Sequence, residues 1–186
     1  MKTLVVLAHP KLQESRVNRM WKSRLQQEPS ITVHDLYETY PSGVIDVDQE
    51  QQLLLQHDRI VFQFPFYWYS TPSLLKKWQD EVYTYGFGYG TGNQLKGKEY
   101  MLAISVGRAE ESYRPDGESL YTLDQLLLPL KATVLLTEMQ YVEPFVVYHA
   151  PRLTDEELEA SADRLAAYLT SPAPAPASAG VLIAKS

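Results

Sequence analysis

An aromatic, proline-containing segment at residues 64–70 (FPFYWYS) is the strongest chemical signal in the chain. It follows an apolar run typical of a strand, and residues 71–78 indicate the start of a helix. In open α/β sheets, ligands bind at the carboxyl ends of the strands. Ring-to-ring contacts there contribute about 0.5–1.5 kcal/mol beyond the buried area. We therefore expect this loop to hold a flat ligand, with a hydrophobic corner of the core or a dimer contact as the alternatives.

A second polar loop, residues 9–18 (HPKLQESRVN), separates an apolar run from a helical pattern. The amino end of a helix offers unpaired amide donors and a positive dipole, so Ser15 and the amides after it can receive a phosphate. Asn18 is placed to brace the loop. The glycines and lysine of a nucleoside triphosphate loop are missing, which leaves a monophosphate. Alternatively, Ser15 is only a helix cap and His9 a hydrogen-bonded loop histidine.

A third loop, residues 105–113 (SVGRAEESY), follows another strand-like run. Gly107 permits close backbone approach, Arg108 carries a permanent charge, and Tyr113 offers a donor hydroxyl. The alternative for Arg108 is a surface pair with Glu110 or Glu111.

A glycine-rich segment at residues 86–92 resembles a dinucleotide fingerprint, but it follows a helix instead of a strand, so that interpretation fails. We expect a mobile loop that closes over a substrate or reaches a neighbouring subunit, with a plain connector as the alternative. The four histidines, at 9, 34, 57 and 149, lack metal-ligand spacing, and we expect no metal.

Composition narrows the class of protein. The 186 residues suit one domain, and the formal charge of −6 argues against nucleic-acid binding. The absence of cysteine excludes thiol catalysis and thiolate metal sites. The first apolar run is too short for a signal sequence, and none approaches the roughly 18 residues of a membrane span. We expect a cytoplasmic protein, with peripheral attachment to the inner face of the cell membrane through a partner as an open alternative.

Strand-like runs alternate with helical patterns along the chain, which indicates an α/β fold with a parallel sheet. The expected strands are residues 3–8, 31–36, 60–64, 100–106 and 133–139. The expected helices are residues 16–25, 46–57, 72–83, 121–128 and 155–169. Pro129 should end or kink the fourth helix. Five such units fit a flavodoxin-like, doubly wound five-stranded sheet of order 2-1-3-4-5 over residues 1–170. The Pro/Ala-rich tail, residues 171–186, is expected to be a linker or disordered.

In this strand order the loops after Ala8, Phe64 and Val106 lie at one edge of the sheet, so the three loops above should form one site. Taken together, their residues resemble the NAD(P)H quinone reductase family of flavodoxin-like flavoproteins. The resemblance extends from Lys2 to about Leu169. It rests on Ala8-His9-Pro10 with Ser15 and Asn18, on residues 64–70, on Pro72-Ser73-Leu74-Leu75-Lys76 with Trp78, and on residues 86–90. Residues 35–37, 40–41 and 93–98 resemble one branch, the ancillary flavoproteins of bacterial glutathione-gated potassium efflux systems.

The resemblance implies an FMN cofactor, with FAD as the alternative, and NAD(P)H as co-substrate. It implies that hydride passes from NAD(P)H to flavin N5 and then to a quinone in a ping-pong sequence. His9, Ser15, Arg16, Val17 and Asn18 would hold the phosphate and ribityl chain. Phe66, Tyr67, Trp68 and Tyr69 would surround the isoalloxazine, and Ser105, Val106, Gly107 and Arg108 would follow its polar edge. The chain would form a homodimer. The second hypothesis is a regulatory subunit that binds a potassium/proton antiporter.

The chain departs from the family in its third loop. Many members have several glycines there, whereas Val106 and Arg108 flank a single Gly107, and the histidine that some members place after the position of Tyr113 is missing. We therefore expect polar assistance at the reduced flavin or quinone oxygen to be altered or weak, with Tyr113 and Arg108 as the expected catalytic groups. We expect Arg108 to lie near the N1/O2 edge of the flavin and raise its reduction potential, the alternative being that Arg108 obstructs the pocket.

Overall fold

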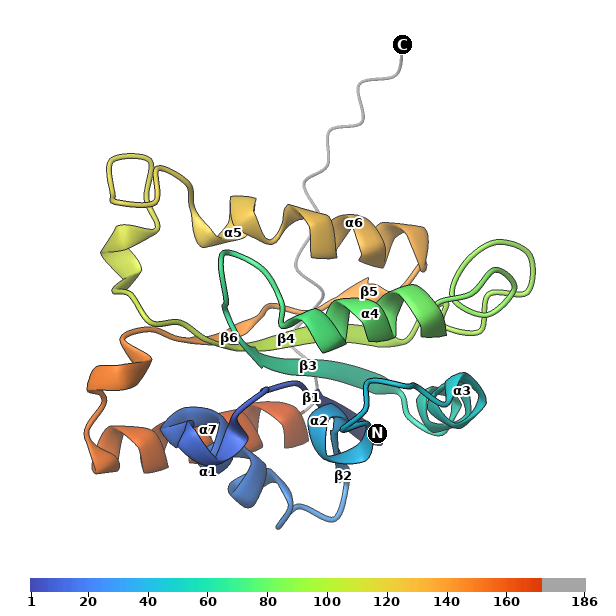
Figure 1. Ribbon diagram of the computed structural model, residues 1–186, viewed down its shortest axis with the longest axis horizontal. Helices are drawn as coiled ribbons and strands as arrows, with labels where there is room; N and C mark the ends of the chain where they lie inside the picture. The colour runs from blue at the N-terminus through green and yellow to red at the C-terminus, as the bar shows by residue number, and fades with distance from the viewer. Residues whose placement is uncertain (172–186) are drawn as a thin grey trace.

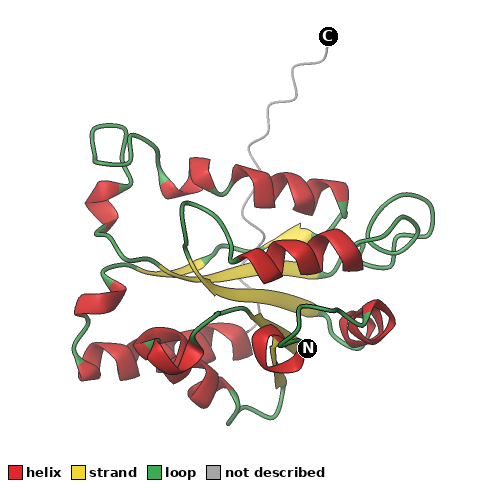
Figure 2. Cartoon of the chain, viewed as in Figure 1, coloured by secondary structure: helices red, strands yellow, loops and turns green. Residues whose placement is uncertain are grey.

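The computed structural model describes residues 1–171, and the predicted Pro/Ala-rich tail lies outside these residues apart from Ser171. Helices cover both faces of a central parallel sheet, which gives three layers (Figures 1 and 2). The strand order is β2-β1-β3-β4-β5, as predicted, with a further short strand, β6, beside β4. The first four strands are β1 (Thr3–Leu7), β2 (Ile31–Asp35), β3 (Arg59–Pro65) and β4 (Glu99–Ser105).

The two faces of the sheet bury separate cores. On one face, α1 (Arg16–Leu25) and α7 (Asp155–Thr170) pack through Trp21 and Leu165, both fully buried. The opposite core includes residues of α2 (Leu36–Thr39), α3 (Val47–Leu55), α4 (Ser73–Val82), α5 (Leu123–Leu126) and α6 (Leu128–Leu136). Three 3₁₀ turns complete the described elements, at Leu12–Glu14, Glu110–Ser112 and Ala150–Arg152. Because β1 and β3 are buried along their whole length, their sequences are mostly apolar, with Arg59 and Gln63 as buried polar residues in β3.

The predicted fifth strand, residues 133–139, is wrong. Most of this segment belongs to α6, and the sheet is completed instead by β5 (Gln140–Tyr141) and β6 (Phe145–Val147), which both pair with β4. α6 begins at Leu128, and Pro129 lies in its first turn, where a missing amide donor costs nothing, so Pro129 favours the start of this helix. Val134 is buried while Leu135 and Leu136 are about 60 % exposed, which is one-sided helical burial.

The glycine-rich segment forms a compact loop. Its Phe87 side chain is buried, and backbone hydrogen bonds join Gly88 to Thr84 (2.8 Å) and Gln94 to Phe87 (2.7 Å). The loop follows α4 and lies at the opposite end of the sheet from the loop after β3 (Figure 1). The expected closure over a ligand therefore does not occur within one chain.

Replacing Gly88 with alanine should destabilise the fold by about 1–3 kcal/mol, because the new Cβ would lie 2.9 Å from the Tyr83 Cα. Urea unfolding of the variant measures this. Gly107→Ala is the matched control, since no atom lies within 4 Å of a Cβ there. Equal midpoints for the two variants would contradict the tight packing of this loop.

Candidate functional site

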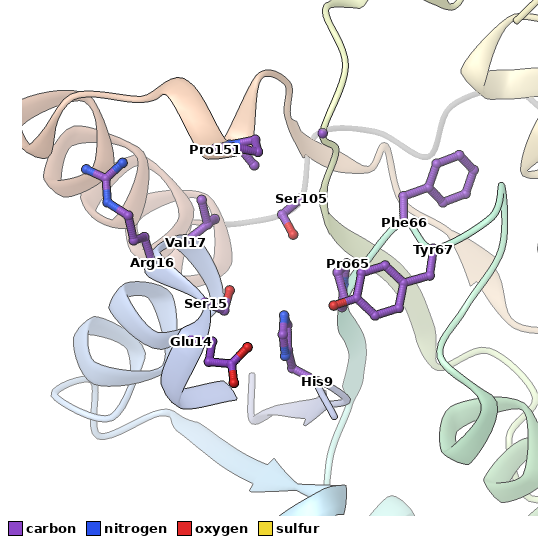
Figure 3. A pocket seen from close by; sticks show the side chains of 12 residues that line it. His9, Glu14, Ser15, Arg16, Val17, Pro65, Phe66, Tyr67, Ser105 and Pro151 are labelled. Atoms are coloured by element: carbon purple, nitrogen blue, oxygen red, sulfur yellow. The ribbon is translucent and has the colours of Figure 1, made fainter. Parts of the chain in front are cut away.

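A cavity of about 430 Å³ opens where the strand order reverses, between the carboxyl ends of β1 and β3 (Figure 3). The first helix, the end of β4 and the 3₁₀ turn before α7 complete its wall. Its lining residues are His9, Glu14, Ser15, Arg16, Val17, Pro65, Phe66, Tyr67, Ser105, Gly107, Ala150 and Pro151. The predicted meeting of the loops after β1, β3 and β4 is confirmed.

The candidate residues divide into two groups. Those that line the cavity are His9, Ser15, Arg16, Val17, Phe66, Tyr67, Ser105 and Gly107. Those that do not are Asn18, Trp68, Tyr69, Val106, Arg108 and Tyr113. Four lining residues were not predicted: Glu14, Pro65, Ala150 and Pro151. The first two lie inside loops that the sequence had indicated. The last two follow β6, a strand that was not predicted because the fifth strand was expected at residues 133–139.

Ser15 presents the amino end of α1 to the cavity. It is the N-cap of α1, and its Oγ accepts a hydrogen bond from the Asn18 amide (3.2 Å). The first backbone hydrogen bond of α1 runs from the Arg19 N–H to the Ser15 carbonyl (3.3 Å). The amides of Arg16 and Val17 come before it, so they make no hydrogen bond within the helix. The cap interpretation is correct, and it leaves the amides free to bind an anion.

His9 offers a neutral donor. The Lys11 amide donates to His9 Nδ1 (3.1 Å), which places the proton of a neutral ring on Nε2. Burial lowers the pKa of His9 and outweighs the opposing effects of Asp35 and Glu14. The ring lies across from Tyr67 at 6.0 Å in an edge-on arrangement (Figure 3).

The aromatic loop is held in an unusual backbone conformation. Tyr67 and Ser70 form an antiparallel bridge, closed by the Ser70 N–H to Tyr67 carbonyl bond (2.9 Å). The two residues between them have positive φ, +48° at Trp68 and +62° at Tyr69, which is rare for bulky side chains. Trp68 is 93 % exposed. Strained backbone of this kind concentrates at ligand sites, which agrees with a ligand-holding loop.

Phe66 connects this loop to the third one. Its ring packs edge-on against Tyr69 (6.5 Å) and tilted against Tyr113 (6.3 Å). Tyr113 is therefore part of the support behind the wall, and its side chain is mostly buried. Burial raises the pKa of the Tyr113 phenol despite the opposing charge of Arg108, so the phenol stays protonated at neutral pH.

Arg108 forms an exposed ion pair with Glu118, so the expected surface pair with Glu110 or Glu111 is wrong. The local chain turns back at residues 114–120, which brings position 118 nearer than sequence spacing suggests. The Arg108 carbonyl accepts from the His149 amide (2.9 Å), which ties the third loop to the segment after β6.

Neither a metal-binding cluster nor a membrane-spanning helix occurs among residues 1–171. No group of three or more His, Asp or Glu side chains there is arranged to bind a metal. No helix in this part of the chain has the length and apolar character of a membrane span.

A parallel sheet of this order, covered on both faces and carrying its cavity at the β1/β3 reversal, defines a flavodoxin-like α/β protein. The sequence pattern of the Flavodoxin_2 family, described as a flavodoxin-like fold, matches residues 1–169. The chain belongs to this family. The uncharacterized NAD(P)H oxidoreductase YrkL of Bacillus subtilis is 51 % identical over 91 % of this chain and 98 % of its own. The potassium-efflux ancillary protein KefG of Pectobacterium carotovorum is 44 % identical over 93 % and 95 %.

Solved structures extend the comparison. General stress protein 14 of Treponema denticola, in complex with FMN, has a TM-score of 0.86 and 41 % identity over 91 % of this chain and 98 % of that one. An NADPH-quinone reductase from P. pentosaceus has a TM-score of 0.85 and is 32 % identical over 92 % of this chain and 99 % of that one. A structure described as a thermophilic tryptophan halogenase from Streptomycin violaceusniger has a TM-score of 0.88. It is 44 % identical over 91 % of this chain and 99 % of that one. Similar structures thus carry different named activities, so the reaction must follow from the chemistry of the pocket.

Proposed function

We propose that the chain is an FMN-dependent NAD(P)H:quinone oxidoreductase. The observation that carries this proposal is a cavity with hydrogen-bond donors along one wall and aromatic rings along the other. Relatives named NAD(P)H oxidoreductases and an FMN complex of the same fold support it.

The donor wall fits a phosphate. The amides at the start of α1, the His9 Nε2–H group and the Ser15 hydroxyl are all suited to an anion. Ser105 was expected along the edge of the ring, but its hydroxyl and that of Ser15 share the Asn18 Nδ2 donor, so we assign Ser105 to this donor wall. Glu14 is the opposing charge at this wall, and it pairs with Lys11 (3.5 Å). We propose FMN rather than FAD because the donor wall accounts for one phosphate and the aromatic wall for one ring system.

The protein's part in the reaction is to bind, orient and exclude water. Bound FMN would supply the hydride chemistry, taking hydride at N5 from NAD(P)H and giving it to a quinone in a separate half-reaction. Phe66 and Tyr67 would hold the flavin ring in its plane. Gly107 has no side chain, so its backbone could approach the edge of that ring closely. Tyr113, which packs against Phe66 behind this wall, would hold that ring in place.

The absorbance spectrum of the purified protein tests this function. The protein should be yellow, or become yellow with FMN, and NADPH added without oxygen should bleach it. A soluble quinone should then restore the colour. Colourless protein that FMN cannot reconstitute would overturn the proposal.

We further propose that Arg108 raises the flavin reduction potential. Arg108 directly follows Gly107, which lines the cavity, and its guanidinium pairs with Glu118 outside the cavity, so its charge would act on the flavin from a distance. Arg108→Ala should lower the potential by about 10–30 mV, measured by redox titration of the bound flavin. Arg114→Ala, in the exposed loop nearby, is the control and should not change it. An unchanged potential in Arg108→Ala with flavin bound would contradict this role.

A second candidate function is regulation of a potassium/proton antiporter, favoured by the 44 % identity to KefG. We propose a homodimer in either case, because two aromatic side chains are exposed: Trp68 in the aromatic loop, and Tyr85 directly before the glycine-rich segment expected to reach a neighbouring subunit. Slow bleaching by NADPH together with tight binding to antiporter cytoplasmic domains would favour the regulatory function. Sedimentation of the protein as a single chain would exclude the dimer.

A further inference from the structure

Gln63 lies beneath the cavity without lining it. It is fully buried in β3, and its Nε2 donates to the Asn18 carbonyl (3.1 Å) and to Asn18 Oδ1 (3.3 Å). Both partners are acceptors on one residue, so the amide of Gln63 must face them with its nitrogen. Gln63 Oε1 has no partner among the described residues. The orientation of this side chain is therefore set by Asn18 alone.

This contact in turn fixes the amide of Asn18. With Oδ1 turned toward Gln63, Asn18 Nδ2 faces the opposite way and donates to Ser105 Oγ (2.9 Å) and Ser15 Oγ (3.2 Å). Reversing the amide would place two NH₂ groups against each other and lose the bond from Gln63. Asn18 is almost fully buried, so water cannot compensate for that loss.

The fixed amide determines what the two hydroxyls offer to a ligand. Ser15 Oγ accepts from both the backbone amide and Nδ2 of Asn18, which occupies its two lone pairs. Ser105 Oγ accepts from Asn18 Nδ2 as well. Each hydroxyl therefore keeps its proton for another acceptor. Both side chains line the cavity, on the same side as His9 (Figure 3).

We propose that Gln63 is a positioning residue that sets the hydrogen-bond polarity of the cavity and so selects a flavin that carries a phosphate. Gln63 orients Asn18, and Asn18 holds the hydroxyls of Ser15 and Ser105 as donors toward the anion. This inference rests on the proposed FMN cofactor and adds to it the residue that makes the donor wall uniform in polarity.

A double-mutant cycle tests this, with the ratio of FMN to riboflavin affinity as the readout, measured by quenching of flavin fluorescence. Gln63→Met frees the Asn18 amide to reverse and should lower the ratio about tenfold. Asn18→Asp places an acceptor toward both hydroxyls and should lower it further. In the Asn18→Asp background, Gln63→Met should have little added effect, because a carboxylate is an acceptor in either orientation.

The outcomes separate the two proposals. Wild-type protein that binds FMN no better than riboflavin overturns the proposed function. Wild-type protein that prefers FMN, with Gln63→Met lowering the ratio equally in both backgrounds, overturns only the positioning role, because a packing effect would be additive. If Gln63→Met does not fold, Ser105→Ala takes its place. It should lower the ratio in the wild-type background and leave it unchanged beside Asn18→Asp, and an equal loss in both backgrounds overturns the role.

Discussion

Replacing Glu50 with leucine should destabilise the protein by about 3–5 kcal/mol, because it removes the shared acceptor of a buried cluster. The carboxylate is fully buried and accepts from Tyr40 Oη (2.6 Å), Trp78 Nε1 (2.7 Å) and His34 Nε2 (2.8 Å). These bonds join α3 to α4 and to the segments around β2. A leucine would leave the buried Tyr40 hydroxyl and Trp78 N–H, and the partly buried His34 ring, without their partner. Chemical unfolding of the variant measures the loss.

Gln49→Leu is the control, since it adds the same side chain to an exposed neighbour on α3 and should change stability little. A loss below 1 kcal/mol in Glu50→Leu would show that the cluster contributes little to the folded state.

The same carboxylate predicts how stability depends on pH. Burial alone would raise the pKa of Glu50, but the hydrogen bonds from His34, Tyr40 and Trp78 outweigh it and hold the pKa below its ordinary value of 4.5. A lowered pKa in the folded state stabilises the protein above pH 4.5, and this contribution is lost as the pH falls through the folded-state pKa. As the pH falls from about 5 through the folded-state pKa of Glu50, the free energy of unfolding should therefore decrease less in Glu50→Leu than in the wild type.

Replacing Ser15 with aspartate should weaken FMN binding by about 30- to 1000-fold while changing riboflavin binding little. A carboxylate at this cap would lie beside the bound phosphate, and two like charges about 5 Å apart at an effective dielectric constant of about 20 repel by about 3 kcal/mol. Isothermal titration with each flavin measures the difference.

Ser15→Asn separates charge from capping. Asparagine and aspartate both cap helices well, so α1 should form in each variant, but only aspartate adds a charge. Equal weakening of FMN binding in the two variants, or equal loss of FMN and riboflavin in Ser15→Asp, would place the phosphate away from α1.

Most of the fold could be predicted from local patterns. The buried strands β1, β3 and β4 are mostly apolar, and the capping box of Thr154 and Glu157 marks the start of α7. The last part of the sheet could not be predicted, because a short apolar run such as residues 134–136 is compatible with either a strand or a helix. In the structure these residues continue α6, which has Pro129 in its first turn, and the short β5 and β6 pair with β4 in place of the predicted strand.

The candidate site was predictable to the level of loops. Residue types marked the aromatic loop, the helix cap and the third loop, and all three contribute to one cavity. They did not show that Trp68 points outward at the tip of a strained turn, or that Arg108 pairs with Glu118. Those features depend on backbone turns that bring together residues whose separation in sequence carries no signal.

The sequence by itself determined the strand order, the edge of the sheet where the loops meet and the kinds of side chain present there, because apolar periodicity and chain connectivity are local properties. Only the tertiary structure decided how the polar atoms are oriented. Gln63 is one more buried strand residue in the sequence, and its bond to Asn18, 45 residues away, becomes visible only when β3 packs beside α1. Hydrogen-bond direction depends on three-dimensional contacts between distant residues, and that direction makes the hydroxyls of Ser15 and Ser105 donors.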